Sequence, residues 1–437
     1  MIIQALRRIS GRIIPKSSFA RSVITLMTGT GLAQIVPIAL SPILTRLYTP
    51  QDFGVFALYG SICAILAVLV TGKYELAIVV PKHDSEAINL VAVTIFLSLL
   101  ISFFLLGVVL IWGGQIVSML GHKEVQSWLY IMPFATLILG CYYALNFWAN
   151  RRSRYKNMAV SRVVQSGASG AMQLAAGFSK IGLLGLILGQ VAGQLLSMLF
   201  LARSLYRDER RLFRRISVKR MFYVARRHIG YPKYMVPGQI MSVGATEMPL
   251  LLLTVFFGAG VAGFYSLAQR VMAAPLSLVA NAIGDVYRQK AAGQYASNGE
   301  CLDIFLGSLK RLVLLAFLPM LPVLVFGPWL FAFVFGDNWR AAGEIASLLS
   351  VLVFFQTLSS PLSSTVLLPG WLHLDSLWQC ARLCIAGLVF CICDSAGVGY
   401  RVAIIAHVCA FSCLYLLHSY FQYRAARGRA VAHNDFD

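Results

Sequence analysis

Long apolar stretches separated by short polar segments extend along the whole of this chain. An α-helix needs about 20 mostly apolar residues to cross the hydrocarbon core of a bilayer. The pattern predicts twelve such helices, at residues 22–44, 53–71, 88–111, 128–149, 159–178, 181–202, 234–257, 260–284, 308–335, 343–367, 371–393 and 396–421. We therefore expect an all-α integral membrane protein without a separate soluble domain.

Lys and Arg residues are concentrated in every second polar segment, most densely at 203–233. Cytoplasmic loops carry an excess of these residues, so the pattern places both termini in the cytoplasm. The predicted organisation has five parts: a basic cytoplasmic N-terminal segment (1–21), an N-terminal six-helix bundle (22–202), a basic cytoplasmic linker (203–233), a C-terminal six-helix bundle (234–421) and a cytoplasmic tail (422–437).

The composition agrees with a membrane location and excludes several other classes. The chain is 58% hydrophobic and 12% charged, and its formal net charge is +20. Nucleic-acid binding is not expected, because the basic residues lie between apolar stretches rather than along one soluble face. The nine cysteines fall mostly in apolar stretches and are interpreted as small buried hydrophobes. No metal site and no cofactor are predicted.

Two segments of the chain suggest an internal repeat. The stretch "PILTRLYTPQDFGVFALYG" (42–60) can be aligned with "PLLLLTVFFGAGVAGFYSLAQ" (249–269), because Gly-aromatic-Leu patterns begin at Gly54 and Gly263. Two halves with an even number of spans keep the same orientation, so a pseudo-two-fold axis would run along the membrane normal. Gly and Pro also interrupt the first span of each half, and paired interruptions of this kind point to a transport site.

Ionisable residues inside predicted spans are candidate functional residues, because burying a charge in lipid is costly. Glu247 and Arg270 lie near the middle of two successive spans. Two interpretations are open: the residues form a structural pair across adjacent helices, or they face a hydrated cavity. In the second case Arg270 contacts an anionic substrate and Glu247 binds a coupling proton or cation. Arg162, within a span, and Arg46 and Arg152, near span ends, would add positive charge to that cavity.

Motifs for soluble catalysis are absent from the sequence. It contains no Gly-rich phosphate loop followed by Lys-Ser/Thr, no H-E-x-x-H and no G-x-S-x-G. No catalytic residue is predicted, and the protein is not expected to be an enzyme.

Three segments resemble those of a known group of transporters. They are "LTRLYTPQDFGVFALYGSICAILAVLVTGKYELAIVVPKHDSEAINLVAV" (44–93), "NFWANRRSRYKNMAVSRV" (146–163) and "VAGFYSLAQRVMAAPLSLVANAIGDVYRQKAA" (261–292). On these segments the chain resembles the Wzx-type polysaccharide or O-antigen flippases of the multidrug/oligosaccharidyl-lipid/polysaccharide exporter superfamily. Members often carry an R-x-Y-x-P-x-D-F-G turn and a G-x-Y-E-x-A-I stretch, and many have another polar residue in place of Glu247.

The resemblance implies a V-shaped pair of six-helix bundles related by pseudo-two-fold symmetry. It also implies that the protein moves an oligosaccharide linked to undecaprenyl diphosphate across the bacterial inner membrane. The movement would occur by alternating access through a cationic cavity. The oligosaccharide would serve the assembly of lipopolysaccharide O-antigen or of another surface polysaccharide. The implied partners are the lipid-linked oligosaccharide, the bilayer, a proton or sodium ion, and a polysaccharide polymerase. An ion-coupled drug or metabolite antiporter and a membrane glycan polymerase or ligase remain alternatives.

The stretch "TGKYELAIVVPK" (71–82) is expected at the cytoplasmic mouth of such a passage. Lys73 and Glu75 would meet a substrate there, or they pair with each other and anchor the end of a span. Both interpretations stay open from the sequence.

Overall fold

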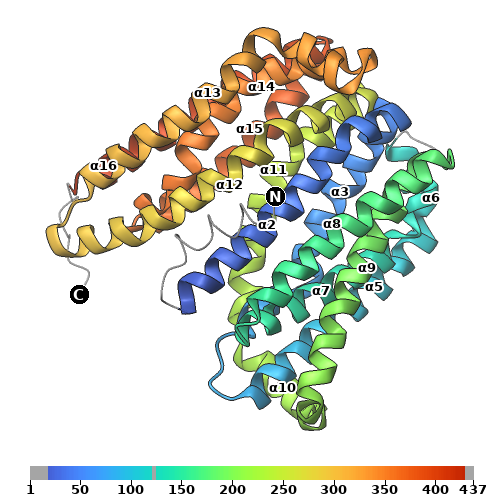
Figure 1. Cartoon of the computed structure of the whole chain (residues 1–437), viewed down its shortest axis with the longest axis vertical. Coiled ribbons are helices and arrows are strands. Elements are labelled where there is room, and N and C mark those ends of the chain that lie inside the picture. The colour runs from blue at the N-terminus through green and yellow to red at the C-terminus, as the bar shows by residue number, and fades with distance from the viewer. Residues whose placement is uncertain (1–17, 121–124, 429–437) are drawn as a thin grey trace, which may run out of the picture.

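The computed structural model describes residues 18–120 and 125–428, and this part of the chain contains helices and turns but no β-strand. Twelve long helices account for most of these residues (Figure 1). They are α2 (Ser18–Leu47), α3 (Pro50–Thr71), α5 (Asp84–Leu120), α7 (Met132–Arg151), α8 (Tyr155–Phe178), α9 (Leu183–Glu209), α11 (Val236–Phe257), α12 (Ala259–Asn298), α13 (Leu302–Phe335), α14 (Arg340–Ser359), α15 (Leu372–Ser395) and α16 (Tyr400–Ala426). Each predicted span overlaps a different one of them, although the span at 343–367 continues into a 3₁₀ helix after α14 and the span at 128–149 begins before α7. The fold class is confirmed.

Short helices connect or extend the long ones. They are α4 (Tyr74–Ala77), α6 (Val125–Leu129), the 3₁₀ helices η1 (Arg210–Arg215), η3 (Asp337–Trp339) and η4 (Ser360–Leu367), α10 (Val218–Arg227) and the π-helix η2 (Tyr231–Met235). Ten segments of the described chain are long and apolar enough to cross a membrane. The long helices α8 and α12 are not among them, because both carry polar side chains such as Gln165 on α8 and Arg270 on α12.

The same pairs of helices pack together in each half of the chain. In the first half the packed pairs include α2–α8, α8–α9, α5–α7, α7–α9 and α3–α7. In the second half the equivalent pairs are α11–α15, α15–α16, α13–α14, α14–α16 and α12–α14. The repeat of six helices is therefore visible in the packing. Of the predicted terminal segments 1–21 and 422–437, residues 1–17 and 429–437 lie outside the described part.

The two halves meet through α3, which packs on both α11 and α12. In Figure 1 they converge where α2 ends and α3 begins, and they diverge toward the ends that carry α10 and the end of α12. One buried apolar cluster joins the halves at the convergent end, since Phe53 lies edge-on to Trp339 at a centroid separation of 5.0 Å. The indole Nε1 of Trp339 also donates a hydrogen bond to the carbonyl oxygen of Thr45 (3.0 Å).

The turn between α2 and α3 is fixed by a capping box. The Thr49 hydroxyl accepts a hydrogen bond from the Asp52 amide (3.2 Å), and the Asp52 carboxylate accepts one from the Thr49 amide (2.9 Å). Pro50 occupies the first turn, where its missing N–H costs nothing. The "YTPQDFG" segment thus starts α3 at a defined angle against the second half.

The linker between the halves is held on the first half. The amide side chain of Asn89 on α5 donates to the carbonyl of Arg215 (3.2 Å) and accepts from the amide of Ser217 (3.1 Å). The Tyr74 hydroxyl donates to the Ala225 carbonyl of α10 (3.0 Å). The basic helix α10 therefore lies across the end of the first bundle.

Candidate functional site

A cavity of about 1090 Å³ lies between the two halves. Its walls come from α3, α4, α7, α8 and α9 of the first half and from α11 and α12 of the second. The cavity is therefore built at the interface that the predicted repeat would create.

Side-chain amides and hydroxyls supply most of the polar lining. The amides come from Gln165, Gln190, Gln194, Gln239 and Gln269, and the hydroxyls from Tyr59, Ser61, Tyr143, Ser242, Thr246, Ser266 and Ser277. We did not predict the glutamines as site residues. One signal was available, because Gln190 and Gln194 are spaced i and i+4 within an apolar helix and so share one face.

Glu247 and Arg270 both line this cavity. Both residues are partly buried, and no ion pair within 4.0 Å joins their side chains in the described structure. Glu247 instead accepts a hydrogen bond of 2.6 Å from the hydroxyl of Ser61 on α3. Both side chains therefore border the cavity, and they do not form an ion pair with each other in the described structure.

Arg270 also borders a second cavity of about 360 Å³ inside the first half. Gln34 and Pro37 of α2 line it, together with Gln173 of α8. The predicted interruption of the first span is not seen, because α2 continues as one helix through Pro37 and Pro42. The part of α2 that contains Pro37 borders a space that one arginine of the second half reaches. This places a guanidinium among neutral amides, with no acidic residue among the lining groups.

Lys73 and Glu75 line the main cavity from the short segment that follows α3. Gly72 and Lys73 both have a left-handed backbone, with φ values of 55° and 59°, so the chain turns sharply here. The Lys73 ammonium lies 3.7 Å from the Glu75 carboxylate. Glu75 is 4% exposed, and its Oε2 atom has no hydrogen-bond partner. The two residues thus form an ion pair that also borders the cavity.

The other three predicted site residues lie elsewhere. Arg46 is exposed in the last turn of α2, and Arg162 donates a hydrogen bond to the Thr30 hydroxyl. Arg152 is paired with Asp84 (2.9 Å) and Glu209 (2.7 Å). None of these three is among the residues that line the cavity.

This arrangement corrects the expected cationic character of the cavity. Its charged lining residues are two cations, Lys73 and Arg270, and two acids, Glu75 and Glu247. Arg152 is unavailable because acids at the ends of α5 and α9 neutralise it. The cavity is therefore polar and balanced in formal charge, and the predicted roles of these residues in substrate binding remain predictions.

The described residues contain no group of three or more His, Cys, Asp or Glu side chains arranged to hold a metal ion.

Buried histidines occur in the second half, and His407 packs between Phe390 and Phe411 at centroid separations of 5.3 and 4.3 Å. His418 stacks on Trp378. Neither histidine lines the cavity.

Two similar helical halves around a cavity, with ten segments of the described chain long and apolar enough to cross a bilayer, define a multi-pass membrane protein. The chain belongs to the polysaccharide biosynthesis protein family, whose model matches residues 43–344. It is 26% identical over 320 residues to the succinoglycan biosynthesis transport protein ExoT of Rhizobium meliloti (strain 1021), covering 71% of this chain and 61% of that protein. It is 25% identical over 142 residues to the teichuronic acid biosynthesis protein TuaB of Bacillus subtilis (strain 168), covering 32% of this chain and 29% of that protein.

The chain thus spans less than two thirds of the length of these relatives. Among solved structures, it is similar to the lipid II flippase MurJ in an inward closed conformation, with a TM-score of 0.71, 13% identity and coverage of 92% of this chain and 90% of that chain. It is also similar to an inward-facing multidrug resistance MATE family transporter of the MOP superfamily, with a TM-score of 0.64, 13% identity and coverage of 92% and 94%. At this identity the likeness establishes the fold.

Proposed function

We propose that this protein is a flippase that moves a lipid-linked oligosaccharide, carried on undecaprenyl diphosphate, across the bacterial inner membrane. The proposal rests on one observation: a cavity of about 1090 Å³ between the halves is lined by five glutamines and by several hydroxyl groups. Glutamine amides both donate and accept hydrogen bonds, which suits the hydroxyl groups of a sugar chain. ExoT and TuaB, by their names, belong to polysaccharide biosynthesis, which supports the same class of substrate.

Arg270 is the residue that we assign to the diphosphate. Its guanidinium borders both cavities and has no ion-pair partner within 4.0 Å in the described part of the chain. Arginine presents parallel N–H donors that match phosphate oxygens. Lys73 is less suited, because Glu75 already neutralises it.

The positive-inside pattern supports an orientation with both termini in the cytoplasm. In that orientation the convergent ends of the halves, with the α2–α3 turn, face away from the cytoplasm. The cavity would then be accessible from the cytoplasm, where the substrate is made. Transport would require the halves to separate at the Phe53–Trp339 contact and to close at the opposite end, an alternating-access cycle.

Glu247 is the proposed binding site for a coupling proton. Its carboxylate accepts a hydrogen bond from Ser61 of the other half, so protonation would change a contact between the halves. A cation antiporter of the same superfamily is the second candidate, since the fold is also that of a MATE transporter and an acidic side chain lies in the cavity.

The test is a deletion strain complemented with single variants, in which surface polysaccharide and drug resistance are both measured. Deletion should abolish a surface glycan, and Arg270→Ala should lower export by about 10- to 100-fold, because a charge-assisted hydrogen bond contributes about 1.5–3 kcal/mol. Arg46→Ala is the matched control and should export normally. An unchanged glycan with increased sensitivity to cationic drugs would overturn the flippase proposal in favour of the antiporter.

A further inference from the structure

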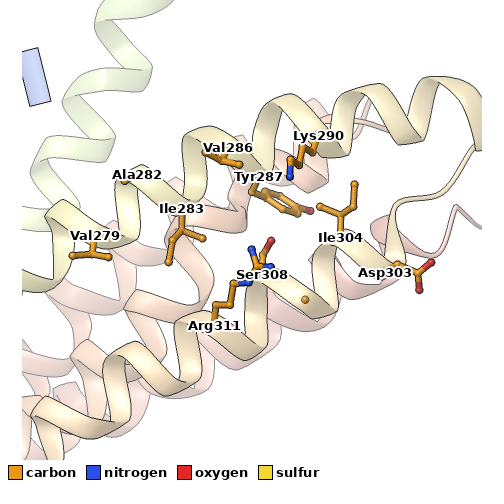
Figure 2. Close-up of a pocket in the computed structure, with 11 residues that line it drawn as sticks. Val279, Ala282, Ile283, Val286, Tyr287, Lys290, Asp303, Ile304, Ser308 and Arg311 are labelled. Carbon is orange, nitrogen blue, oxygen red and sulfur yellow. The ribbon is translucent and has the colours of Figure 1, made fainter. Parts of the chain in front are cut away.

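A third cavity, of about 380 Å³, lies between α12 and α13, away from the central passage. Two facing stripes form it. Val279, Ala282, Ile283, Val286, Tyr287 and Lys290 come from α12, and Asp303, Ile304, Gly307, Ser308 and Arg311 come from α13. Figure 2 shows the Lys290 and Arg311 side chains reaching toward the space between the helices, whereas Asp303 lies at its far end.

This cavity is on the opposite side of α12 from the central one. Arg270 and Ser277 line the central cavity, whereas Val279 and Val286 line this one. Arg270 precedes Val279 by nine positions, and Ser277 precedes Val286 by nine positions. Nine positions correspond to about 180° around an α-helix. Val279 and Val286 are 45% and 53% exposed, so the cavity opens toward the lipid rather than toward the transported substrate.

The chemistry of the lining has two parts. Aliphatic side chains make up much of it, and two of the lining residues are cations. Lys290 and Arg311 are exposed, and neither has an ion-pair partner within 4.0 Å in the described structure. Both are close to the turn that joins α12 to α13, so the positive-inside pattern puts them at the cytoplasmic headgroup level. Basic pockets between helices at this level suit anionic lipid headgroups.

We propose that this cavity binds an anionic diacyl phospholipid of the inner leaflet. The phosphate lies between Lys290 and Arg311, and the first part of an acyl chain lies on Val279, Ile283 and Val286. Gly307 leaves the space open, because a Cβ added at this position meets nothing within 4 Å. A bound lipid would join α12, which lines the transport cavity, to α13 behind it.

The experiment measures lipid binding to the purified full chain by native mass spectrometry, with phosphatidylglycerol and phosphatidylcholine of identical acyl chains. We expect phosphatidylglycerol to bind about 10-fold more tightly or better, and Lys290→Gln with Arg311→Gln to remove this preference, since each cation contributes about 1 kcal/mol. The matched control, Arg288→Gln with Lys310→Gln, changes two cations at the same membrane level outside the cavity and should retain the preference.

A second variant tests the cavity without changing charge. Gly307→Leu should fill the space and lower phosphatidylglycerol binding about as much as the Lys290/Arg311 double variant does. An unchanged elution volume in size-exclusion chromatography would show that the variant is folded. Inorganic phosphate should not displace the lipid. Equal binding of the two lipids, unchanged binding in the Lys290/Arg311 double variant, or displacement by phosphate alone would each overturn the proposal.

Discussion

Gly54 of α3 and Gly263 of α12 lie against each other where the two halves meet. A Cβ added to Gly54 would come within 1.7 Å of the Ala259 carbonyl oxygen, and one added to Gly263 within 1.9 Å of the Pro50 carbonyl oxygen. Each added Cβ would also lie 3.0 Å from the amide nitrogen of the other glycine. These glycines are equivalent positions of the predicted repeat, and equivalent residues can touch only close to the symmetry axis. The axis therefore passes between them.

A methyl group at this contact should disturb the convergent end of the halves. We expect Gly54→Ala to cost about 1–3 kcal/mol of stability, because the clash is with backbone atoms that cannot rotate away. Thermal unfolding in detergent measures the effect. Gly60→Ala on the same helix is the matched control, since a Cβ there meets nothing within 4 Å. Equal melting temperatures for the two variants would contradict the prediction.

The hydrogen bond between Ser61 and Glu247 links α3 to α11 across the cavity. We expect Ser61→Ala and Glu247→Leu each to destabilise the present conformation by about 1–3 kcal/mol, because the first removes the donor and the second removes the acceptor of this hydrogen bond. The double variant should lose little more than either single variant, because both remove the same interaction. Distances between spin labels on the two halves report the conformational equilibrium. Ser242→Ala, at another cavity serine, should leave those distances unchanged, and strictly additive effects would contradict the link.

Arg152 and Arg270 should differ in what their loss affects. Arg152 is bonded to Asp84 and Glu209 and is 29% exposed, so Arg152→Gln should lower stability by about 1 kcal/mol or less and leave substrate affinity unchanged. Arg270→Gln should instead weaken transport at low substrate concentration while the protein remains folded. Transport rates in proteoliposomes at several substrate concentrations separate the two effects. The assignment fails if Arg152→Gln changes the apparent substrate affinity as much as Arg270→Gln does.

The sequence predicted the helices well because membrane-spanning segments follow one strong rule, the match between apolar length and bilayer thickness. It also singled out Glu247 and Arg270, because a charge in the middle of a span must face something polar, but it left open whether the two residues pair with each other or line the cavity. The glutamines were missed because a neutral amide in a span is less costly than a charge and stands out less. Arg152 was misplaced relative to the cavity because its partners, Asp84 and Glu209, are distant in sequence and only the tertiary fold brings them together.

Asn89 is one of the residues that hold the linker on the first half. Its side chain is buried and bonds backbone groups of Arg215 and Ser217. Asn89→Ala leaves these backbone groups without a partner, which costs about 1–3 kcal/mol locally. We expect trypsin to cleave the linker faster in this variant, as followed by gel electrophoresis. Asn298→Ala, at an exposed asparagine, serves as the control, and equal cleavage rates would show that the linker is held by other contacts.

The docking of the linker should also depend on pH through His228, which follows α10. Burial and the neighbouring charge of Arg227 lower the pKa of His228, and its buried Nε2 atom has no hydrogen-bond partner. Because the docked linker holds this proton more weakly than the released linker does, docking is favoured above the ordinary histidine pKa and weakens as the pH falls through it. We expect linker cleavage to accelerate between about pH 7.5 and 5.5 in the wild type. His228→Gln, compared at the same pH so that the activity of the protease cancels, should remove the acceleration, and an equal acceleration in that variant would assign the effect to another group.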